Sequence, residues 1–298
     1  MNLSYLNTSV LKFNVQLNDP GFGGDAVILD LEDSVHNIAK MRAREVIATL
    51  DLSGITRKDI TFGVRINSLY TIEGVRDIDI IYACCESGSL TIDFLQLPKV
   101  KSHYDIQFCK ALLEKLPTRI KIIPIIEIPE AVENVDQIAA LSDAMMFGQV
   151  DMPASMYQIN EAYLSYARGR FCVACAKENI AAIDTTVINQ NITLNDMSAF
   201  EKECIAGKAE GFTAKAVIHP AQIPIVNKIF AATQKELEQY HSIVSRYEKA
   251  KEGFSIIDGM VIAPPFVARA KMMLRLYNAK PRTVPETSIL SSYTENIL

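Results

Sequence analysis

The feature that most constrains the fold of this chain is a series of short, unbroken apolar runs separated by stretches with helical periodicity. Unbroken apolar strands indicate burial on both faces, which is typical of a parallel sheet covered by helices. The eight runs are residues 3–6, 26–31, 61–66, 94–97, 120–126, 144–147, 181–183 and 214–218. Eight such units over about 230 residues predict a TIM (β/α)8 barrel rather than an open doubly wound sheet.

Helical periodicity fills most of the gaps between the runs, at 40–50, 106–116, 131–141, 161–177 and 197–207. No G-x-G-x-x-G motif opens any of these helices, so a dinucleotide-binding fold is not supported. The prediction is therefore an α/β chain in three parts. These parts are a TIM-barrel catalytic domain at 1–232, a C-terminal helical extension at 233–279 and a flexible tail at 280–298. The extension is expected to hold helices at 234–253 and 264–276, with a turn at Asp258-Gly259 between them.

Composition agrees with a globular enzyme and excludes several other classes. The chain has 298 residues, 49% of them hydrophobic, which is enough to bury a large core. Its formal net charge is −5 and its 30 basic residues form no dense block, so no nucleic-acid partner is expected. The N-terminus lacks a basic region followed by an apolar stretch, and no segment approaches the roughly 18 apolar residues of a membrane span. We expect a cytoplasmic protein with no membrane partner.

Six cysteines are expected to be thiols in a reducing compartment. Cys172 and Cys175 form a C-x-x-C, which occurs in redox and zinc sites. This one lies inside a predicted helix, with no second C-x-x-C and no histidine nearby. Packing is the favoured interpretation.

Carboxylates follow two successive apolar runs. The stretch I-I-P-I-I-E ends in Glu127, and A-M-M-F-G-Q-V-D ends in Asp151. Neighbouring parallel strands lie roughly 4.8 Å apart, so both side chains can be aimed at one ion. The pair predicts a divalent metal site and hence an enzyme.

Other polar residues also lie within or just after the apolar runs. They are Asp30, Glu32, Asp33, Arg65, Asn67, Lys99, Asp184 and His219. A charged residue after a strand is also how any strand reaches solvent, so each one alone has a structural interpretation. Together with Glu127 and Asp151 they occur at seven of the eight runs, and this recurrence predicts a site at the carboxyl ends of the barrel strands, where barrel enzymes place their chemistry.

Several motifs occur in order along the chain. They are D-L-E-D-S-V at 30–35, Lys40 with Ala43-Arg44, V-R-I-N at 64–67, L-P-K at 97–99, I-I-E at 125–127, F-G-x-x-D at 147–151, A-I-D at 182–184 and K-A-V-I-H-P-x-Q-I at 215–223. From residue 4 to residue 277 the chain thus resembles the HpcH/HpaI aldolase and citrate lyase β-subunit family, which includes citryl-CoA, malyl-CoA and citramalyl-CoA lyases. The resemblance implies a Mg²⁺-dependent carbon–carbon lyase or aldolase. Such an enzyme cleaves or forms a bond beside a small 2-oxo or hydroxy acid.

The resemblance also implies roles for individual residues. Glu127 and Asp151 match the metal ligands, and they would leave positions on the ion for the oxygens of the substrate. The same hard oxygen ligands accept Mn²⁺. Arg65 matches the arginine that clamps the substrate carboxylate, a task that suits a guanidinium. Its alternative is a structural salt bridge to the acids after the second run, and both can hold.

The remaining candidates keep two interpretations each. Glu32 and Asp33 are expected to hydrogen-bond metal-bound water or to pair with Lys40 and Arg44, Asp33 being the better candidate for a direct catalytic part. Lys99 either contacts substrate or neutralises the acidic mouth. His219 is either a general base or a hydrogen-bonded structural residue, and the second interpretation is favoured.

Two departures from the family pattern concern the second substrate. Residues 3–9 lack the arginine and the Pro-Gly turn with which CoA-using members hold the nucleotide, so a CoA thioester is doubtful and a non-CoA partner is considered. Ala263 stands where malyl-CoA lyase-like members have an aspartate that transfers a proton, and alanine has no group for that task. The resemblance implies a homo-oligomer, a trimer or hexamer. The alternative function is an accessory barrel that binds metal and oxo acid without turnover.

Overall fold

A closed parallel barrel forms the first compact unit of the chain, residues 2–229, in the computed structural model. The structure describes residues 2–16, 24–52, 60–187, 197–249, 253–257 and 260–278. The barrel strands pair in chain order and close between the last and the first. They are β1 (Ser4–Ser9), β2 (Ala26–Asp30), β3 (Thr61–Arg65), β4 (Phe94–Leu97), β5 (Lys121–Ile126), β6 (Ala144–Phe147), β7 (Ala181–Thr185) and β8 (Ala214–Val217). The predicted TIM barrel is confirmed.

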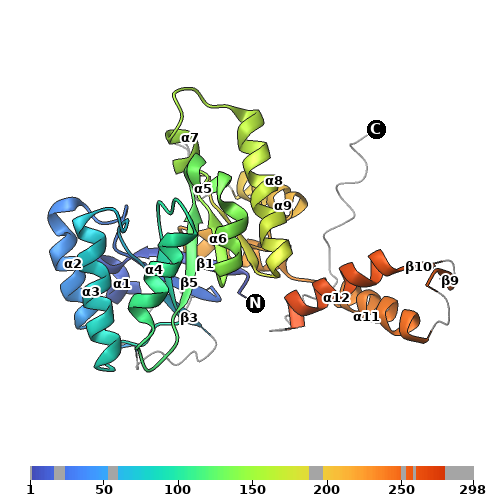
Figure 1. Cartoon of the computed structure of the whole chain (residues 1–298), viewed down its shortest axis with the longest axis horizontal. Coiled ribbons are helices and arrows are strands. Elements are labelled where there is room, and N and C mark those ends of the chain that lie inside the picture. Colours follow the sequence, from blue (N-terminus) through green and yellow to red (C-terminus); the bar gives the residue numbers. More distant parts are fainter. Residues whose placement is uncertain are drawn as a thin grey trace. The chain divides into compact units, whose positions relative to one another are not determined.

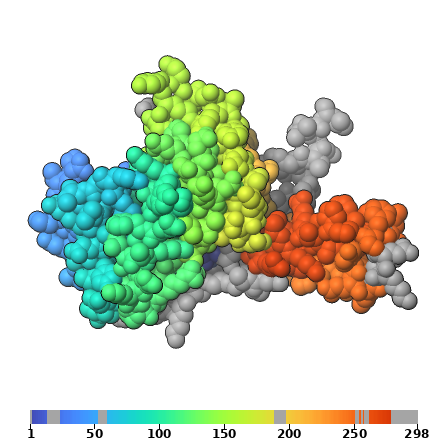
Figure 2. Space-filling view, viewed as in Figure 1, coloured from blue at the N-terminus to red at the C-terminus, as the bar shows by residue number. Residues whose placement is uncertain are grey.

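Helices surround the strands (Figure 1), with α2 packed on α3, α4 on α6 and α6 on α8. They are α1 (Val10–Gln16), α2 (Lys40–Ala48), α3 (Ile72–Glu86), α4 (His103–Leu113), α5 (Pro129–Glu133), α6 (Val135–Leu141), α7 (Asp151–Ala154), α8 (Glu161–Glu178), α9 (Ser198–Glu210) and α10 (Ile223–Phe230), with 3-10 turns η1 (Asn37–Ala39) and η2 (Pro220–Gln222). On the face seen in Figure 2 they form the surface of this unit, from blue to yellow-green. Among the described helices, none has the length and apolar character needed to cross a membrane.

The helix predicted at 131–141 was wrong in one respect, because two short helices occupy that stretch. Asn134 lies between α5 and α6 with φ −100° and ψ 8°, outside regular helical geometry. Its side-chain amide donates to the carbonyls of Glu130 and Lys101, at 2.9 and 3.0 Å. A side-chain amide that bonds local carbonyls competes with the helical ladder, so the helix breaks here.

The barrel interior is filled by side chains at alternate strand positions. Ala26 and Ile28 of β2, for example, belong to this cluster, whereas Val27 and Leu29 of the same strand are buried on the other side under the helices. Burial of both faces is what unbroken apolar strands predict. Gly63 of β3 completes the packing, because a Cβ at this position would lie 2.1 Å from the ring of Phe94.

The second compact unit, residues 230–298, contains α11 (Gln234–Lys249), an antiparallel pair of β9 (Ser255–Ile257) and β10 (Met260–Ile262), and α12 (Pro264–Asn278). The two helices lie where the sequence predicts them, whereas the strand pair was not predicted. Thr233 and Glu236 begin α11, since each accepts a hydrogen bond from the other's backbone amide, at 3.2 and 2.7 Å. The predicted turn at Asp258-Gly259 and the predicted tail at 280–298 lie outside the described residues.

Candidate active site

Glu127 and Asp151 follow neighbouring strands at the same end of the barrel. Glu127 comes directly after β5, Asp151 begins α7 after β6, and Ile126 pairs with Phe147 in the register of the two strands. Glu127 is 2% exposed, and Asp151 is half-buried. Burial, reinforced by the charge of Asp151 and opposed by Lys99, raises the pKa of Glu127 to about 7.

Lys99 joins the two carboxylates. Its ammonium nitrogen contacts Asp151 Oδ1 and lies 3.5 Å from Glu127 Oε1. Its backbone N–H donates to Glu127 Oε1 at 2.7 Å. Burial lowers the pKa of Lys99, but the charges of Glu127 and Asp151 outweigh it, so the net shift is upward. Of its two predicted roles, neutralising the acids is observed in these contacts, and contact with substrate stays a prediction.

The backbone of Lys99 adopts a left-handed conformation, with φ 54°. This region costs an L-residue free energy because the Cβ approaches the carbonyl oxygen. The conformation accompanies the hydrogen bond from the Lys99 amide to Glu127. Non-glycine residues in such conformations cluster at functional sites, where surrounding contacts hold them.

Arg65, the last residue of β3, is held by Asp30, the last residue of β2, and by the two acids that follow β2. Its Nε and NH2 donate to Oδ1 and Oδ2 of Asp30, both at 2.7 Å, in a bidentate pair. Its NH1 lies 3.5 Å from Asp33 Oδ2 and 3.0 Å from Glu32 Oε2, the latter an ion pair without hydrogen-bond geometry. The predicted structural salt bridge is therefore present. NH1 is the nitrogen of Arg65 with the weaker contacts.

The loop after β2 brings Glu32 toward the same mouth. Asp30 accepts from the amides of Glu32 and Ser34 at 2.8 and 3.0 Å, which fixes the turn. Burial tends to raise the pKa of Asp30, but the charge and hydrogen bonds of Arg65 outweigh it and the net shift is downward. Burial, opposed by Arg65 and reinforced by Glu127 and Asp33, raises the pKa of Glu32 to about 8. We call Glu32, Arg65, Lys99, Glu127 and Asp151 the mouth cluster.

The expected pairing of Glu32 and Asp33 with Lys40 was wrong. The Lys40 ammonium donates to the backbone carbonyls of Leu31 and Glu32, both at 2.7 Å, rather than to a carboxylate. Lys40 is buried beneath the loop, so it satisfies carbonyl groups that the loop would otherwise bury unpaired. Asp33 carries a side chain that is 61% exposed and reaches Arg65 instead.

The expected pairing with Arg44 was also wrong. Arg44 on α2 pairs with Asp77 at 2.9 Å and with Glu73 at 2.7 Å, both on α3. Because α2 packs on α3, a side chain on the face between them reaches the neighbouring helix rather than the loop. Arg44 is thus a link between helices.

Two further predicted residues have structural contacts. Asn67 donates from its side chain to Asp77 Oδ2 at 2.6 Å and to the carbonyl of Leu31 at 3.0 Å. His219 accepts at Nδ1 from the amide of Ala221 at 3.1 Å and so begins η2. The structural interpretation of His219, which the sequence favoured, agrees with this contact.

The cysteines of the C-x-x-C motif are buried on α8. Burial raises the pKa of Cys172 to about 12 and raises that of Cys175 as well. Thiols of this kind are inert. Across the residues that the structure describes, no group of three or more His, Cys, Asp or Glu side chains is arranged to hold a metal.

The two mouth carboxylates fit a magnesium ion. Magnesium is usually held by one or two protein carboxylates, with waters or substrate oxygens completing six ligands. A single ammonium nitrogen contacts both acids, so they converge on one position of positive charge. Gly148 leaves space for the Glu127 carboxylate, because a Cβ at position 148 would lie 2.8 Å from Glu127 Oε2.

Gln149, Asp184 and Lys215 were missed as a group by the sequence analysis. Asp184 and Lys215 are both 0% exposed and pair at 2.6 Å between β7 and β8. Gln149 donates from Nε2 to Asp184 Oδ1 at 2.7 Å. A lysine inside an apolar run was a usable signal, since lysine is almost never fully buried unless it is paired.

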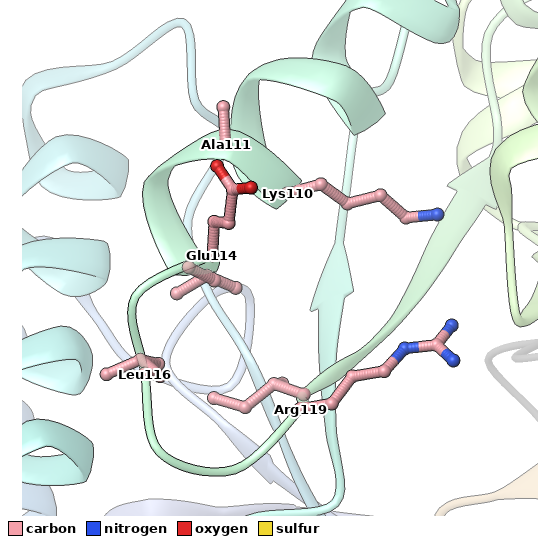
Figure 3. Close-up of a pocket in the computed structure, with 7 residues that line it drawn as sticks. Lys110, Ala111, Glu114, Leu116 and Arg119 are labelled. Atoms are coloured by element: carbon pink, nitrogen blue, oxygen red, sulfur yellow. The ribbon is translucent and has the colours of Figure 1, made fainter.

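A hollow of about 530 Å³ lies elsewhere on the barrel, at the end of α4 (Figure 3). Its lining includes Lys110, Ala111, Glu114, Leu116, Arg119 and Ile120. Ile120 precedes β5, so this hollow lies at the amino end of that strand, opposite to Glu127. Barrel enzymes place their active sites at the carboxyl ends of strands, so the hollow is separate from the candidate site.

Comparison with known proteins agrees with this geometry. The sequence model of the HpcH/HpaI aldolase/citrate lyase family matches residues 16–220. Citrate lyase subunit beta of Leuconostoc mesenteroides subsp. cremoris is 30% identical over 279 residues, covering 87% of this chain and 87% of the relative. The (3S)-malyl-CoA thioesterase of Cereibacter sphaeroides is 27% identical over 267 residues, covering 85% of this chain and 87% of the relative.

A solved structure shares the fold. CitE from Mycobacterium tuberculosis, in complex with magnesium, acetoacetate and coenzyme A, has a TM-score of 0.70 at 21% identity and covers 93% of this chain and 98% of its own. The barrel and the acids at its mouth define a TIM-barrel enzyme. This chain belongs to the HpcH/HpaI aldolase/citrate lyase family, and it is an enzyme of the carbon–carbon lyase class.

Proposed function

We propose that this chain is a Mg²⁺-dependent carbon–carbon lyase or aldolase that acts on a small 2-oxo or hydroxy acid. The observation that carries the proposal is the convergence of Glu127 and Asp151 on one cationic nitrogen, that of Lys99. Magnesium-bound structures of Mycobacterium tuberculosis relatives hold oxaloacetate or pyruvate, which supports the ion and the class of substrate. Glu127 and Asp151 would hold the metal, and Mn²⁺ would be accepted by the same ligands.

The mouth cluster would bind and orient the substrate. Bound Mg²⁺ would act as a Lewis acid and as a template for the substrate oxygens. Arg65 would bind the substrate carboxylate through NH1, and this contact would replace the present one between NH1 and the exposed Asp33. Asp30 holds the opposite edge of the guanidinium, so its orientation is set before substrate arrives.

Proposed acid–base work falls to Glu32 and Asp33. Glu32 Oε2 is buried and has no hydrogen-bond partner, which leaves it open to a substrate hydroxyl or a water. A bound metal would compensate the negative charges of Glu127 and Asp151 in place of Lys99, and the Lys99 ammonium would then be free to contact the substrate. A buried carboxylate oxygen without a hydrogen bond is costly, so Glu32 Oε2 is expected to accept one when the site is filled.

The second substrate is proposed to be other than a CoA thioester. The stretch around β1 lacks the arginine and Pro-Gly turn expected of CoA-using members. One relative is named as a malyl-CoA thioesterase and another was solved in complex with coenzyme A, so the CoA thioester is the direct competitor of this proposal. Homo-oligomeric assembly, a cytoplasmic location and a division into catalytic domain and extension near residue 232 also stay proposals.

Calorimetric titration tests the site. Mg²⁺ with pyruvate, oxaloacetate or glyoxylate is titrated into wild type, Glu127→Gln and Asp151→Asn, with and without acetyl-CoA. Asp136→Asn removes an acid from the surface of α6 and serves as the matched control. The proposal expects metal-dependent binding of an oxo acid in wild type and the control, and loss of it in both site variants. No binding in any combination would contradict the proposal. Additional heat with acetyl-CoA would indicate that the second substrate is a CoA thioester.

A further inference from the structure

A buried ionic group supports the loop that carries Asp151. We call Asp184, Lys215, Arg168 and Glu203 the wall network. Lys215 Nζ lies 2.6 Å from Asp184 Oδ2 and 2.7 Å from Glu203 Oε1, and Arg168 NH1 lies 3.0 Å from Asp184 Oδ1. Asp184 and Lys215 belong to the A-I-D and K-A-V-I-H-P motifs, for which the proposed chemistry has no use.

The wall network reaches the loop through Gln149. Its Nε2 donates to Asp184 Oδ1 and to the carbonyl of Thr185, both at 2.7 Å. Its backbone amide donates to Thr185 Oγ1 at 3.0 Å, and that hydroxyl donates to the carbonyl of Phe147 at 2.8 Å. Four hydrogen bonds thus fix residues 147–149 to the end of β7, two residues before Asp151.

The neighbouring strand holds the same segment from its other side. The amide of Gly148 donates to the carbonyl of Ile126 at 3.0 Å, directly before Glu127. The segment is therefore tied to the strand that carries Glu127 and to β7. Gly207 of α9 leaves room for the Asp184 carboxylate, because a Cβ at that position would lie 2.8 Å from Asp184 Oδ2.

We propose that Gln149 is a positioning residue that, through Asp184 and Thr185, fixes the β6–α7 loop so that the Asp151 carboxylate converges with Glu127 on a divalent metal. This inference rests on the proposed function, since it requires that metal to bind. A buried ion pair adds little stability over an apolar pair of the same volume. The wall network instead supplies a hydrogen-bond acceptor at a fixed position. Partners that orient metal ligands in this way typically contribute about 10–100-fold to metal affinity.

The test measures Mn²⁺ binding by electron paramagnetic resonance, together with thermal unfolding in EDTA. Gln149→Met keeps the length of the side chain and removes the amide donor, and Thr185→Val keeps the shape and removes the hydroxyl. Thr185→Ser restores the hydroxyl. Gln222→Met is the matched control, because Gln222 is also buried and caps the loop after β8, through bonds from the amides of Ile218 and His219.

The inference expects Gln149→Met and Thr185→Val each to raise the Mn²⁺ dissociation constant by about tenfold or more. Thr185→Ser and Gln222→Met are expected to bind as wild type does, even where Gln222→Met lowers the unfolding temperature. Wild-type affinity in both Gln149→Met and Thr185→Val would overturn the inference alone. Absence of Mn²⁺ binding by wild type would contradict both this inference and the proposed function. If Gln149→Met does not fold, Thr185→Val against Thr185→Ser decides.

Discussion

The mouth cluster and the wall network are two groups of charges at the same end of one barrel, and their surroundings differ. In the wall network, Asp184 and Lys215 are fully buried and in direct contact. In the mouth cluster, burial raises the pKa values of Glu32 and Glu127 to about 8 and about 7, because Arg65 and Lys99 compensate their charges incompletely. Perturbed acids that converge at a barrel mouth indicate a site for a ligand, and paired charges inside a wall indicate support.

The largest expected effect comes from breaking the wall network. Lys215→Met leaves Glu203 without its ammonium partner and leaves Asp184 buried with less compensation. Removing one partner of a buried pair costs about 3–5 kcal/mol, so the free energy of unfolding should fall by that amount. Urea denaturation followed by circular dichroism measures it. A change near zero would show that the wall charges are not required for stability.

The next effect concerns Asp30, which is paired with Arg65 beneath the mouth. Asp30→Asn should lower the free energy of unfolding at pH 7 by about 2–3 kcal/mol, because hydrogen bonds between charged groups are lost. The pKa of Asp30 is lowered in the folded state. Its contribution is therefore complete above the unfolded pKa of about 4 and is lost as the pH falls through the lower folded value.

Urea denaturation of wild type and Asp30→Asn at pH 7 and at pH 3 checks both parts of this expectation. The difference between the two proteins should narrow at the lower pH, since below about pH 4 the unfolded wild type binds a proton at Asp30 more readily than the folded state does. A difference that widens on acidification would show that the sign of the pKa shift is wrong.

A smaller effect separates the backbone of Lys99 from its charge. Lys99→Gly and Lys99→Ala both remove the ammonium, but only glycine adopts φ 54° without strain. Lys99→Gly should therefore be more stable than Lys99→Ala by about 1 kcal/mol. Thermal and urea unfolding of the two variants measures the difference. Greater stability of the alanine variant would mean that this loop relaxes freely and does not hold the Lys99 amide toward Glu127.

The smallest effect is expected at an exposed pair. Asp136 on α6 contacts Arg170 and Lys177 on α8 at 2.7 and 2.9 Å. All three side chains are about a third or more exposed, so Asp136→Asn should cost less than about 1 kcal/mol, and added salt should reduce the cost further. Equal losses for Asp136→Asn and Lys215→Met would remove the distinction between buried and exposed pairs.

The fold was predictable because a strand that is buried on both faces needs an unbroken run of apolar residues, and such a run is visible in the local sequence. The bounds of β4 and β6 agree with the predicted runs, β1 ends three residues later than predicted, and the other strands differ by one or two residues at an end. The division at Asn134 was missed because it depends on a side-chain bond to Lys101, far along the chain. The strand pair of β9 and β10 was missed because each strand has only three residues.

The candidate site was predictable only in part. Residues after strands had to meet at one end of the barrel, so the approach of Glu127, Asp151 and Lys99 followed from topology. The salt bridge of Arg65 was predicted, but the partners of Lys40 and Arg44 were not, because Lys40 reaches backbone carbonyls and Arg44 reaches α3 through tertiary packing. Such long-range choices are set by the faces of neighbouring elements.

Turnover by the wild-type chain with Mg²⁺ tests the proposed lyase activity most directly. Candidate 2-oxo and hydroxy acids, alone and with partner compounds including acetyl-CoA, are incubated with wild type, with wild type in EDTA and with Glu127→Gln. Carbon-13 nuclear magnetic resonance then follows the making or breaking of the carbon–carbon bond. Product is expected only from wild type with the metal. Metal-dependent binding without any product would favour the accessory barrel, and product formed in EDTA or by Glu127→Gln would contradict the metal site.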